Sequence, residues 1–232
     1  NKGQLIHRPF YSYTNINVIG SVPLRKMKTP VNFGSEAIKE EIISFLTQSQ
    51  DEEISWTREE ILRRKNTHGF NWEDFLIIRD KQGSISACCV VLSDYDYRKA
   101  NVANLSFGIR AGQWFASALG RPKIKENSPL RLGYVSFFKT TDRGLEDRAE
   151  KISAFFQAIR RQESKLPKND RFHSITLHEP ASFNMGKRLL KRGHFNLELP
   201  ATLYQVIHET DLNDQSKIKR THSRPDFDIV FH

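Results

Sequence analysis

The segment that most constrains this fold is a strand-like run followed directly by the clearest helical pattern in the chain. Residues 130–138 are mostly apolar and of strand length, and a short polar turn follows them. Between residues 149 and 159, apolar side chains then recur at helical spacing. A further strand-like run, "FHSITL", comes at residues 172–177. Such a strand–helix–strand unit predicts two parallel strands joined by a right-handed crossover.

The sequence before this unit predicts two helices and a β-hairpin. Apolar residues between Ile38 and Leu46 lie on one helical face, and Thr57 with Glu60 forms a capping-box pattern at the start of a second helix. Two strand-like runs, at 75–79 and 84–92, flank the turn sequence Asp-Lys-Gln-Gly.

After the unit, a short helix ends at Gly193 and a last strand covers residues 201–208. The whole order predicts an α/β domain with a mixed, mostly antiparallel central sheet and helices on both faces. Residues 1–30, interrupted by prolines, are predicted to be an irregular N-terminal arm, and residues 210–232 a basic C-terminal tail. The domain itself is expected over residues 31–209.

Charge and cysteine content narrow the class of partner. The formal net charge of +9 favours anionic partners, but the basic residues occur in short clusters separated by acids, as on a solvated surface. Aromatic and cationic residues do not interleave, so a nucleic-acid partner is not expected. The adjacent Cys88 and Cys89 are expected to be reduced core thiols of a cytoplasmic protein, without a metal site. No apolar run is long enough to span a membrane.

Three segments resemble the acyl-CoA N-acyltransferase superfamily, which has the GNAT fold. They are the hairpin "DFLIIRDKQGSISACCVVL", the strand and turn "LRLGYVSFFKTTDRG", and the closing unit "SITLHEPASFNMGKRLLKRGHFNLELPATLYQVI". The resemblance covers about residues 28–209. It implies a GNAT-like acyltransferase domain in which a parallel strand pair splays apart at a bulge. The chain is most similar to the larger or tandem-type members, so a dimer or an upstream tandem half is a possible partner.

The resemblance also implies where an acyl-CoA co-substrate would bind. The pantetheine arm would lie along the strand residues Tyr134, Val135, Ser136, Phe137 and Phe138, and the pyrophosphate on the following turn, at Thr141, Arg143 and Gly144.

The sequence departs from the family's pattern in that turn. Glu146, Asp147 and Arg148 stand where the family has small residues, and two carboxylates there stabilise a helix N-terminus while repelling phosphate. Thr141 and Asp142 also have the chemistry of ordinary N-caps. A plain capped helix is therefore the alternative to a phosphate site.

Two candidate catalytic residues, His178 and Glu179, follow the strand after the helix, at the edge where open α/β sheets bind ligands. Either is a candidate base for deprotonating an amine, and the alternative is a loop histidine beside a surface glutamate. Leu189 stands where the family has a tyrosine that protonates the leaving thiolate. Two functions thus stay open: an N-acyltransferase that moves an acyl group, expected to be acetyl, from acyl-CoA to an amine on a small molecule or protein, or a catalytically inactive GNAT-like domain that binds a partner.

Overall fold

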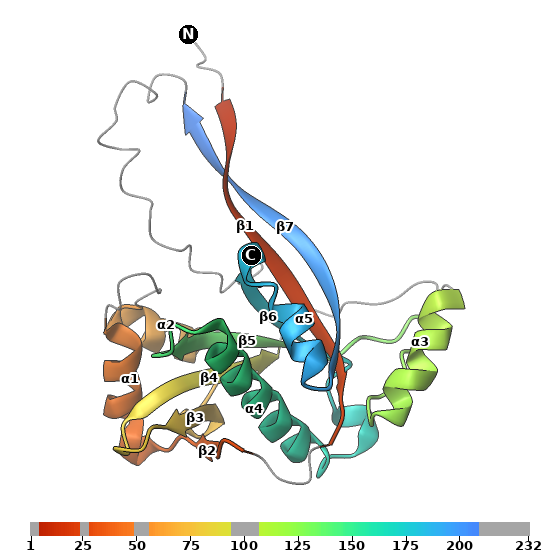
Figure 1. The fold of residues 1–232 in the computed structure, drawn as a ribbon, viewed down its shortest axis with the longest axis horizontal. Helices are drawn as coiled ribbons and strands as arrows, with labels where there is room; N and C mark the ends of the chain where they lie inside the picture. The colour runs from red at the N-terminus through yellow and green to blue at the C-terminus, as the bar shows by residue number, and fades with distance from the viewer. Residues whose placement is uncertain (1–4, 24–27, 49–55, 94–106, 209–232) are drawn as a thin grey trace.

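The sheet has seven strands in the order β2-β3-β4-β5-β6-β1-β7 (Figure 1). The structure is a computed structural model that describes residues 5–23, 28–48, 56–93 and 107–208. Every pairing in the described sheet is antiparallel except that of β5 with β6. The strands are β1 (Leu5–Ser21), β2 (Asn32–Phe33), β3 (Phe75–Arg79), β4 (Ile85–Ser93), β5 (Leu132–Thr140), β6 (Ser174–Pro180) and β7 (His194–His208), and the helices are α1 (Lys39–Thr47), α2 (Arg58–His68), α3 (Phe107–Ala118), α4 (Leu145–Glu163) and α5 (Met185–Lys191).

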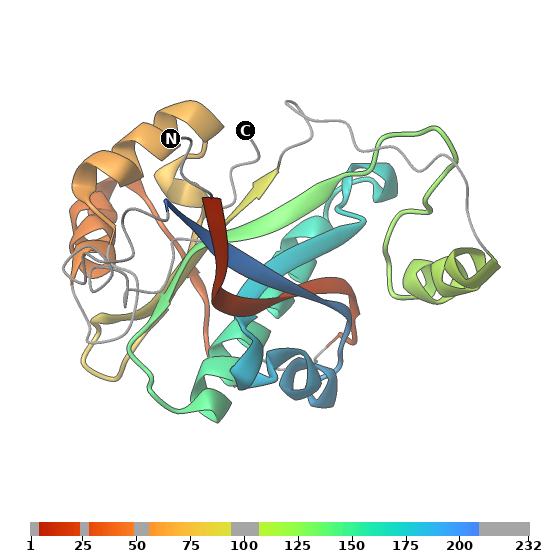
Figure 2. The same cartoon turned by 90° about the horizontal axis from the view of Figure 1, so that it is seen from above.

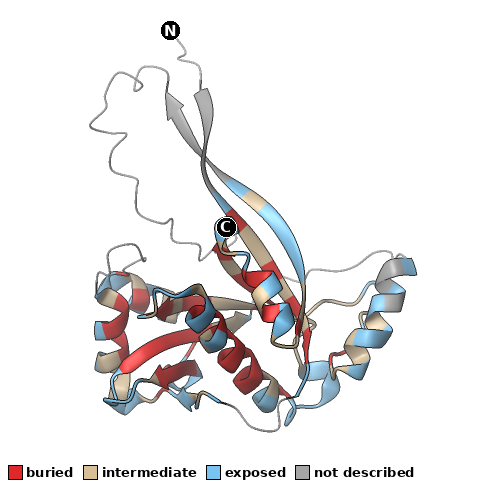
Figure 3. Cartoon of the chain, in the orientation of Figure 1, coloured by how far each residue is buried: buried red, intermediate tan, exposed pale blue. Residues whose placement is uncertain are grey.

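Helices cover both faces of the sheet, which confirms the predicted class (Figure 2). On one face, apolar residues of α4 and α5 pack with Ile175 and Leu177 of β6. On the other face, residues of α1 and α2 pack with Phe75 and Ile77 of β3. The buried residues gather in these two layers (Figure 3). None of the described helices is long and apolar enough to cross a membrane.

The two cysteines lie on β4 with their side chains on opposite faces. Cys88 belongs to the cluster under α1 and α2, whereas Cys89 belongs to the cluster under α4. Both are free thiols, as predicted, and burial raises the pKa of each. The capping box of α2 is also confirmed, because the Thr57 side chain accepts from the Glu60 backbone and the Glu60 carboxylate accepts from the Thr57 N–H.

The prediction of an irregular arm over residues 1–30 is wrong for most of that segment. Leu5–Ser21 forms β1, which lies between β6 and β7 and pairs with both. Ile16 and Val18 are fully buried while Asn17 between them is not, as expected for a strand. Pro9 misled the prediction, since it lies at a register irregularity where a strand tolerates proline. The fold therefore includes residues well before residue 31.

The closing segment differs from the expectation as well. β7 begins at His194, seven residues before the predicted start, because it pairs with β1 along its whole length. Beyond β6, β1 and β7 continue as a long two-stranded ribbon (Figure 1). The predicted basic tail, 210–232, lies outside the described residues.

Candidate functional site

The parallel strands β5 and β6 separate after only three residue pairs. Their pairing joins Leu132 to Ser174 and ends at Tyr134 with Thr176, although β5 continues to Thr140 and β6 to Pro180. Beyond that point the facing edges of the two strands share no ladder of hydrogen bonds. This arrangement confirms the predicted splayed pair.

A bulge in β5 lies beside the separation. Val90 of β4 pairs with Ser136, and Cys88 pairs with Lys139, so one residue of β4 is opposite two of β5. One of these two, Phe137, has a φ of 51°, which is rare for a bulky residue. The residue is 1% exposed, and its ring packs edge-on against Trp56 and Phe70. Burial of this ring stabilises a backbone that would otherwise be strained.

A buried ion pair lies on the α4 side of the separated strands. Arg148 of α4 donates to both carboxylate oxygens of Glu179 on β6 at 3.0–3.2 Å, and their side chains are 4% and 1% exposed. The Arg148 guanidinium also lies 4.6 Å from the ring centroid of Phe138 and 5.7 Å from that of Phe183. Glu179 is therefore a buried structural partner rather than a surface residue.

His178 lies on the opposite face of β6, away from α4. Its Nδ1 is 2.5 Å from the amide oxygen of Asn15, and its ring meets that of Tyr13 edge-on. With that oxygen as acceptor, Nδ1 carries the proton and Nε2 carries the lone pair. Burial lowers the pKa of His178 to about 4, against an opposing effect of the Glu179 charge. The imidazole is therefore neutral at pH 7.

The turn before α4 leaves the helix N-terminus without a side-chain cap. Thr141 uses its N–H and hydroxyl on the carbonyl of Ser86, and Asp142 pairs with Lys151 at 2.7 Å. Neither residue is the N-cap, contrary to the sequence-based alternative; the N-cap is Gly144, which makes no capping side-chain bond. The first N–H groups of α4 thus have no carbonyl partner within the helix.

The two carboxylates of the first turn behave differently from each other. Glu146 pairs with Arg188 and, at 2.7 Å, with Arg192, and the Arg192 hydrogen bond and both positive charges lower its pKa. Its charge is thus balanced by two cations of α5 and the turn after it. Asp147 folds back over the N-cap, with one carboxylate oxygen 2.8 Å from where a Cβ on Gly144 would lie. Asp147 is the carboxylate that a phosphate would meet.

The structure brings some predicted residues together and separates others. The predicted pantetheine strand, Tyr134 to Phe138, begins at the last parallel pair and contains the bulge, and Arg143 and Gly144 are exposed at the turn. His178 and Glu179 face opposite sides of the sheet. Leu189 is fully buried in the α4 layer. Sequence analysis missed Asn15 and Tyr13, for which the alternation with buried apolar residues was the available signal. It also missed the pairing of Arg148 with Glu179, for which the sequence carries no local signal.

The splayed parallel pair, the adjacent bulge and the crossover helix together define a GNAT-like fold. No protein-family model matches the chain, and no curated protein matches it. A similar solved structure is that of a fungal multi-domain GH3 β-N-acetylglucosaminidase with a GCN5-related glucosamine N-acetyltransferase region, at 14% identity and a TM-score of 0.41. The match covers 87% of this chain and 20% of that one, so this chain spans about a fifth of its length. Among the described residues, no group of three His, Cys, Asp or Glu is placed to hold a metal ion.

Proposed function

We propose that the chain is an acyl-CoA-dependent N-acyltransferase, with acetyl as the expected acyl group and an amine on a small molecule or protein as the acceptor. The observation that carries the proposal is the end of β5–β6 pairing at Tyr134 and Thr176. Past that pair, the edge of β5 along Val135–Phe138 has no hydrogen-bonding strand in β6. An extended chain bearing amides, such as pantetheine, has the groups to pair with this edge.

The turn before α4 fits a pyrophosphate in part. Its N-cap makes no side-chain bond, so the first N–H groups and the positive end of the helix dipole face outward. Arg143 is exposed beside them, and Arg188 and Arg192 bring two further cations to the first turn. Asp147 opposes the fit and has to rotate away from Gly144 for phosphate to reach the backbone.

The acyl-CoA supplies a thioester; the amine nitrogen bonds to its carbonyl carbon, the C–S bond breaks, and the amine's proton finally reaches the thiolate sulfur. We assign His178 Nε2 to accept a hydrogen bond from the amine. Asn15 fixes the imidazole, and the neutral ring does not repel a cationic substrate. Because a pKa of about 4 makes a weak base, positioning of the amine accounts for most of its effect.

The second candidate function is a GNAT-like domain that binds a partner without catalysis. It is favoured by the Asp147 carboxylate over the N-cap, by the Arg148–Glu179 pair beside the separated strands, and by Leu189 in the position of the family's tyrosine. Such a domain would have the same sheet but would not require acyl-CoA.

Thermal unfolding and calorimetric titration with CoA, followed by thiol-release assays with acetyl-CoA and a panel of amines, test both functions. At about 100 times its Kd, CoA is expected to raise the melting midpoint by roughly 5–10 °C. His178→Gln should keep CoA affinity but lower kcat/KM by about 10²-fold, whereas His173→Gln, which removes a histidine before the same strand, should not.

Absence of CoA binding at millimolar concentration would overturn the acyltransferase proposal. Binding without turnover of any amine would favour the non-catalytic domain. Equal losses of activity in His178→Gln and His173→Gln would show that His178 has no specific role in the mechanism. That result would not contradict the proposed acyl-CoA site.

A further inference from the structure

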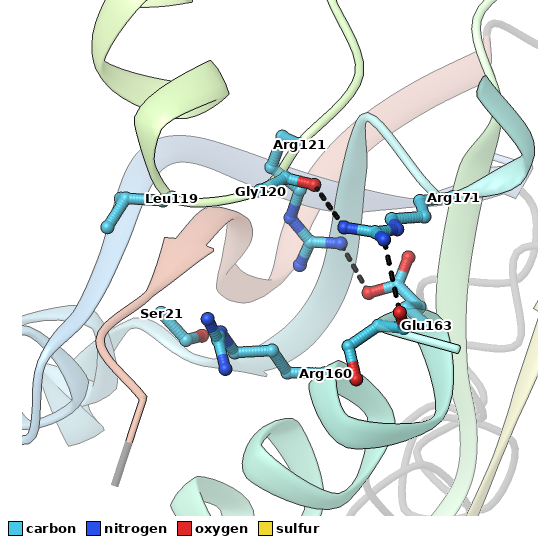
Figure 4. Close-up of a pocket in the computed structure, with 8 residues that line it drawn as sticks. Ser21, Leu119, Gly120, Arg121, Arg160, Glu163 and Arg171 are labelled. Atoms are coloured by element: carbon cyan, nitrogen blue, oxygen red, sulfur yellow. Dashed lines mark hydrogen bonds and ion pairs between the residues drawn. The ribbon is translucent and has the colours of Figure 1, made fainter. Parts of the chain in front are cut away.

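A small cavity lies at the other end of α4, away from the separated strands (Figure 4). Its volume is about 30 Å³. It is bordered by the C-terminal turn of α4, the end of β1, the segment after α3 and the loop before β6. The side chains and backbone that line it include Ser21, Gly120, Arg121, Arg160, Glu163 and Arg171.

The cavity has more positive than negative charge. Three arginines and one glutamate line it, which leaves two positive charges uncompensated among the lining residues. Glu163 already accepts two hydrogen bonds, from Arg121 at 2.5 Å on one oxygen and from the Phe172 N–H at 2.7 Å on the other. The side chains of Arg121 and Glu163 are each 6% exposed, so this pair is part of the wall.

The remaining two arginines differ in what they contact. Arg171 donates to the carbonyls of Gly120, Ser164 and Leu166 at 3.0–3.2 Å, so it supports the end of α4. The Nε of Arg160 is buried and has no hydrogen-bond partner among the described residues. Burial and the charges of Arg121 and Arg171 lower the pKa of Arg160, while Glu163 raises it. A buried N–H without an acceptor is unfavourable, and an anion that entered the cavity and shifted the Arg160 side chain would satisfy it.

We propose that this cavity binds a compact oxyanion, namely phosphate or the phosphoryl group of a small phosphomonoester, with Arg160 as the principal ligand. A volume of about 30 Å³ holds roughly two or three water-sized groups, which suits an oxyanion and excludes a ring. The planar guanidinium fork matches two oxygens of such a group.

This site is separate from the pyrophosphate turn of the proposed function. The 19 residues of α4 span about 28 Å, and the turn and the cavity lie at its two ends. One CoA pyrophosphate cannot occupy both places, so the oxyanion site goes beyond acyl-CoA binding.

Calorimetric titration with inorganic phosphate, in chloride at constant ionic strength, tests the proposal. The matched variants are Arg160→Gln and Arg161→Gln; both remove one charge from the last turns of α4, but Arg161 is exposed and does not line the cavity. Wild type and Arg161→Gln should bind phosphate equally, and Arg160→Gln should bind at least about tenfold more weakly. Arg160→Lys, which keeps the charge without the fork, should fall between them and serves if Arg160→Gln does not fold.

Equal binding by the Arg160 and Arg161 variants, or no binding above the chloride background, would overturn the proposal. Tighter binding of glycerol phosphate than of phosphate would identify an ester's phosphoryl group as the ligand, and the reverse order would identify free phosphate. Acetate binding as tight as phosphate binding would overturn the assignment to phosphate. Phosphate affinity should be unchanged in saturating CoA; displacement by CoA would refute a separate site.

Discussion

The charged side chains at the two ends of α4 differ in sign and in how far they are paired. At the N-terminal end, where the helix dipole favours anions, Glu146 and Glu179 are already paired with arginines and Asp147 covers the N-cap. At the C-terminal end, where the dipole favours cations, the arginines that line the cavity outnumber the single glutamate. Because a helix end carries about half a charge and a guanidinium a whole one, side chains decide which end attracts an anion. In the turn before α4, Asp147 would thus have to move before an anion could reach the N-cap.

Removing Arg148 from its pair with Glu179 should cause the largest loss of stability among these predictions. It also tests whether the buried pair at the N-terminal end of α4 is structural. Arg148→Ala removes the guanidinium that donates to both oxygens of the buried Glu179 carboxylate, so we expect a loss of about 3–5 kcal/mol in the free energy of unfolding. Urea denaturation measures it. The control is Arg188→Ala, which removes a cation of α5 that pairs with Glu146 at the same end of α4. Loss of this more exposed pair should cost less than about 1 kcal/mol. A loss for Arg148→Ala no larger than the control's would mean that the pair has no structural role.

The stability of the protein at low pH should depend on two buried histidines, His178 and His194. The side chain of His194 connects the middle of α4 to β1. Its Nε2 is 2.7 Å from the Ser153 hydroxyl and its Nδ1 is 2.8 Å from that of Ser21. Burial lowers the pKa of His194 to about 4, as it does for His178. Between pH 6.5 and 4 the unfolded chain therefore binds more protons than the folded one.

Stability should thus be constant above about pH 7 and fall as the pH drops from 6.5 toward 4, by up to about 1.4 kcal/mol per pH unit for each histidine. Urea unfolding at several pH values measures the slope, and His178→Gln should reduce it. A slope that is unchanged in this variant would show that His178 titrates normally in the folded protein.

The elements that have their own local periodicity or turn pattern could be predicted from the sequence. The α4 face, the β3–β4 hairpin and the capping box of α2 are local patterns, and the structure confirms all three. β1 was missed because Pro9 within it, and Pro23 and Pro30 after it, outweighed a short alternation around Ile16. Its pairing with β6 and β7 also spans most of the chain. Local signals do not encode such distant partners.

The candidate site was only partly predictable for the same reason. Its backbone features follow from a single strand and turn, whereas its charges depend on contacts between distant segments. Arg148 with Glu179, Glu146 with Arg192, and His178 with Asn15 are separated by 31, 46 and 163 residues. The expected repulsion by Glu146 did not allow for the two arginines that balance it.

Neutralising Asp147 should make the N-terminal end of α4 bind anions more readily and so reduce its difference from the C-terminal end. Asp147→Asn removes the charge over Gly144 without changing the side chain's size, so we expect CoA to bind about three- to tenfold more tightly by calorimetry. Glu150→Gln is the control, since it removes a carboxylate one turn further along α4 that contacts the Thr29 hydroxyl instead. Equal gains from both variants would indicate a general charge effect, and weaker binding to Asp147→Asn would place the phosphate elsewhere.

The smallest expected effect comes from Lys151, which ties the turn before α4 to the sheet. Its Nζ lies 2.7 Å from Asp142 and donates to the Ser86 carbonyl at 3.1 Å, in a partly buried position. Lys151→Gln should therefore lower the free energy of unfolding by about 1 kcal/mol, whereas Lys165→Gln, exposed near the opposite end of the helix, should change it by less than about 0.5 kcal/mol. Combining Lys151→Gln with Asp142→Asn should cost less than the sum of the single changes, because the two residues share one interaction. Strict additivity would mean that the ion pair does not hold the turn. The hydrogen bonds from the Thr141 N–H and hydroxyl to the Ser86 carbonyl would then be what fixes its position.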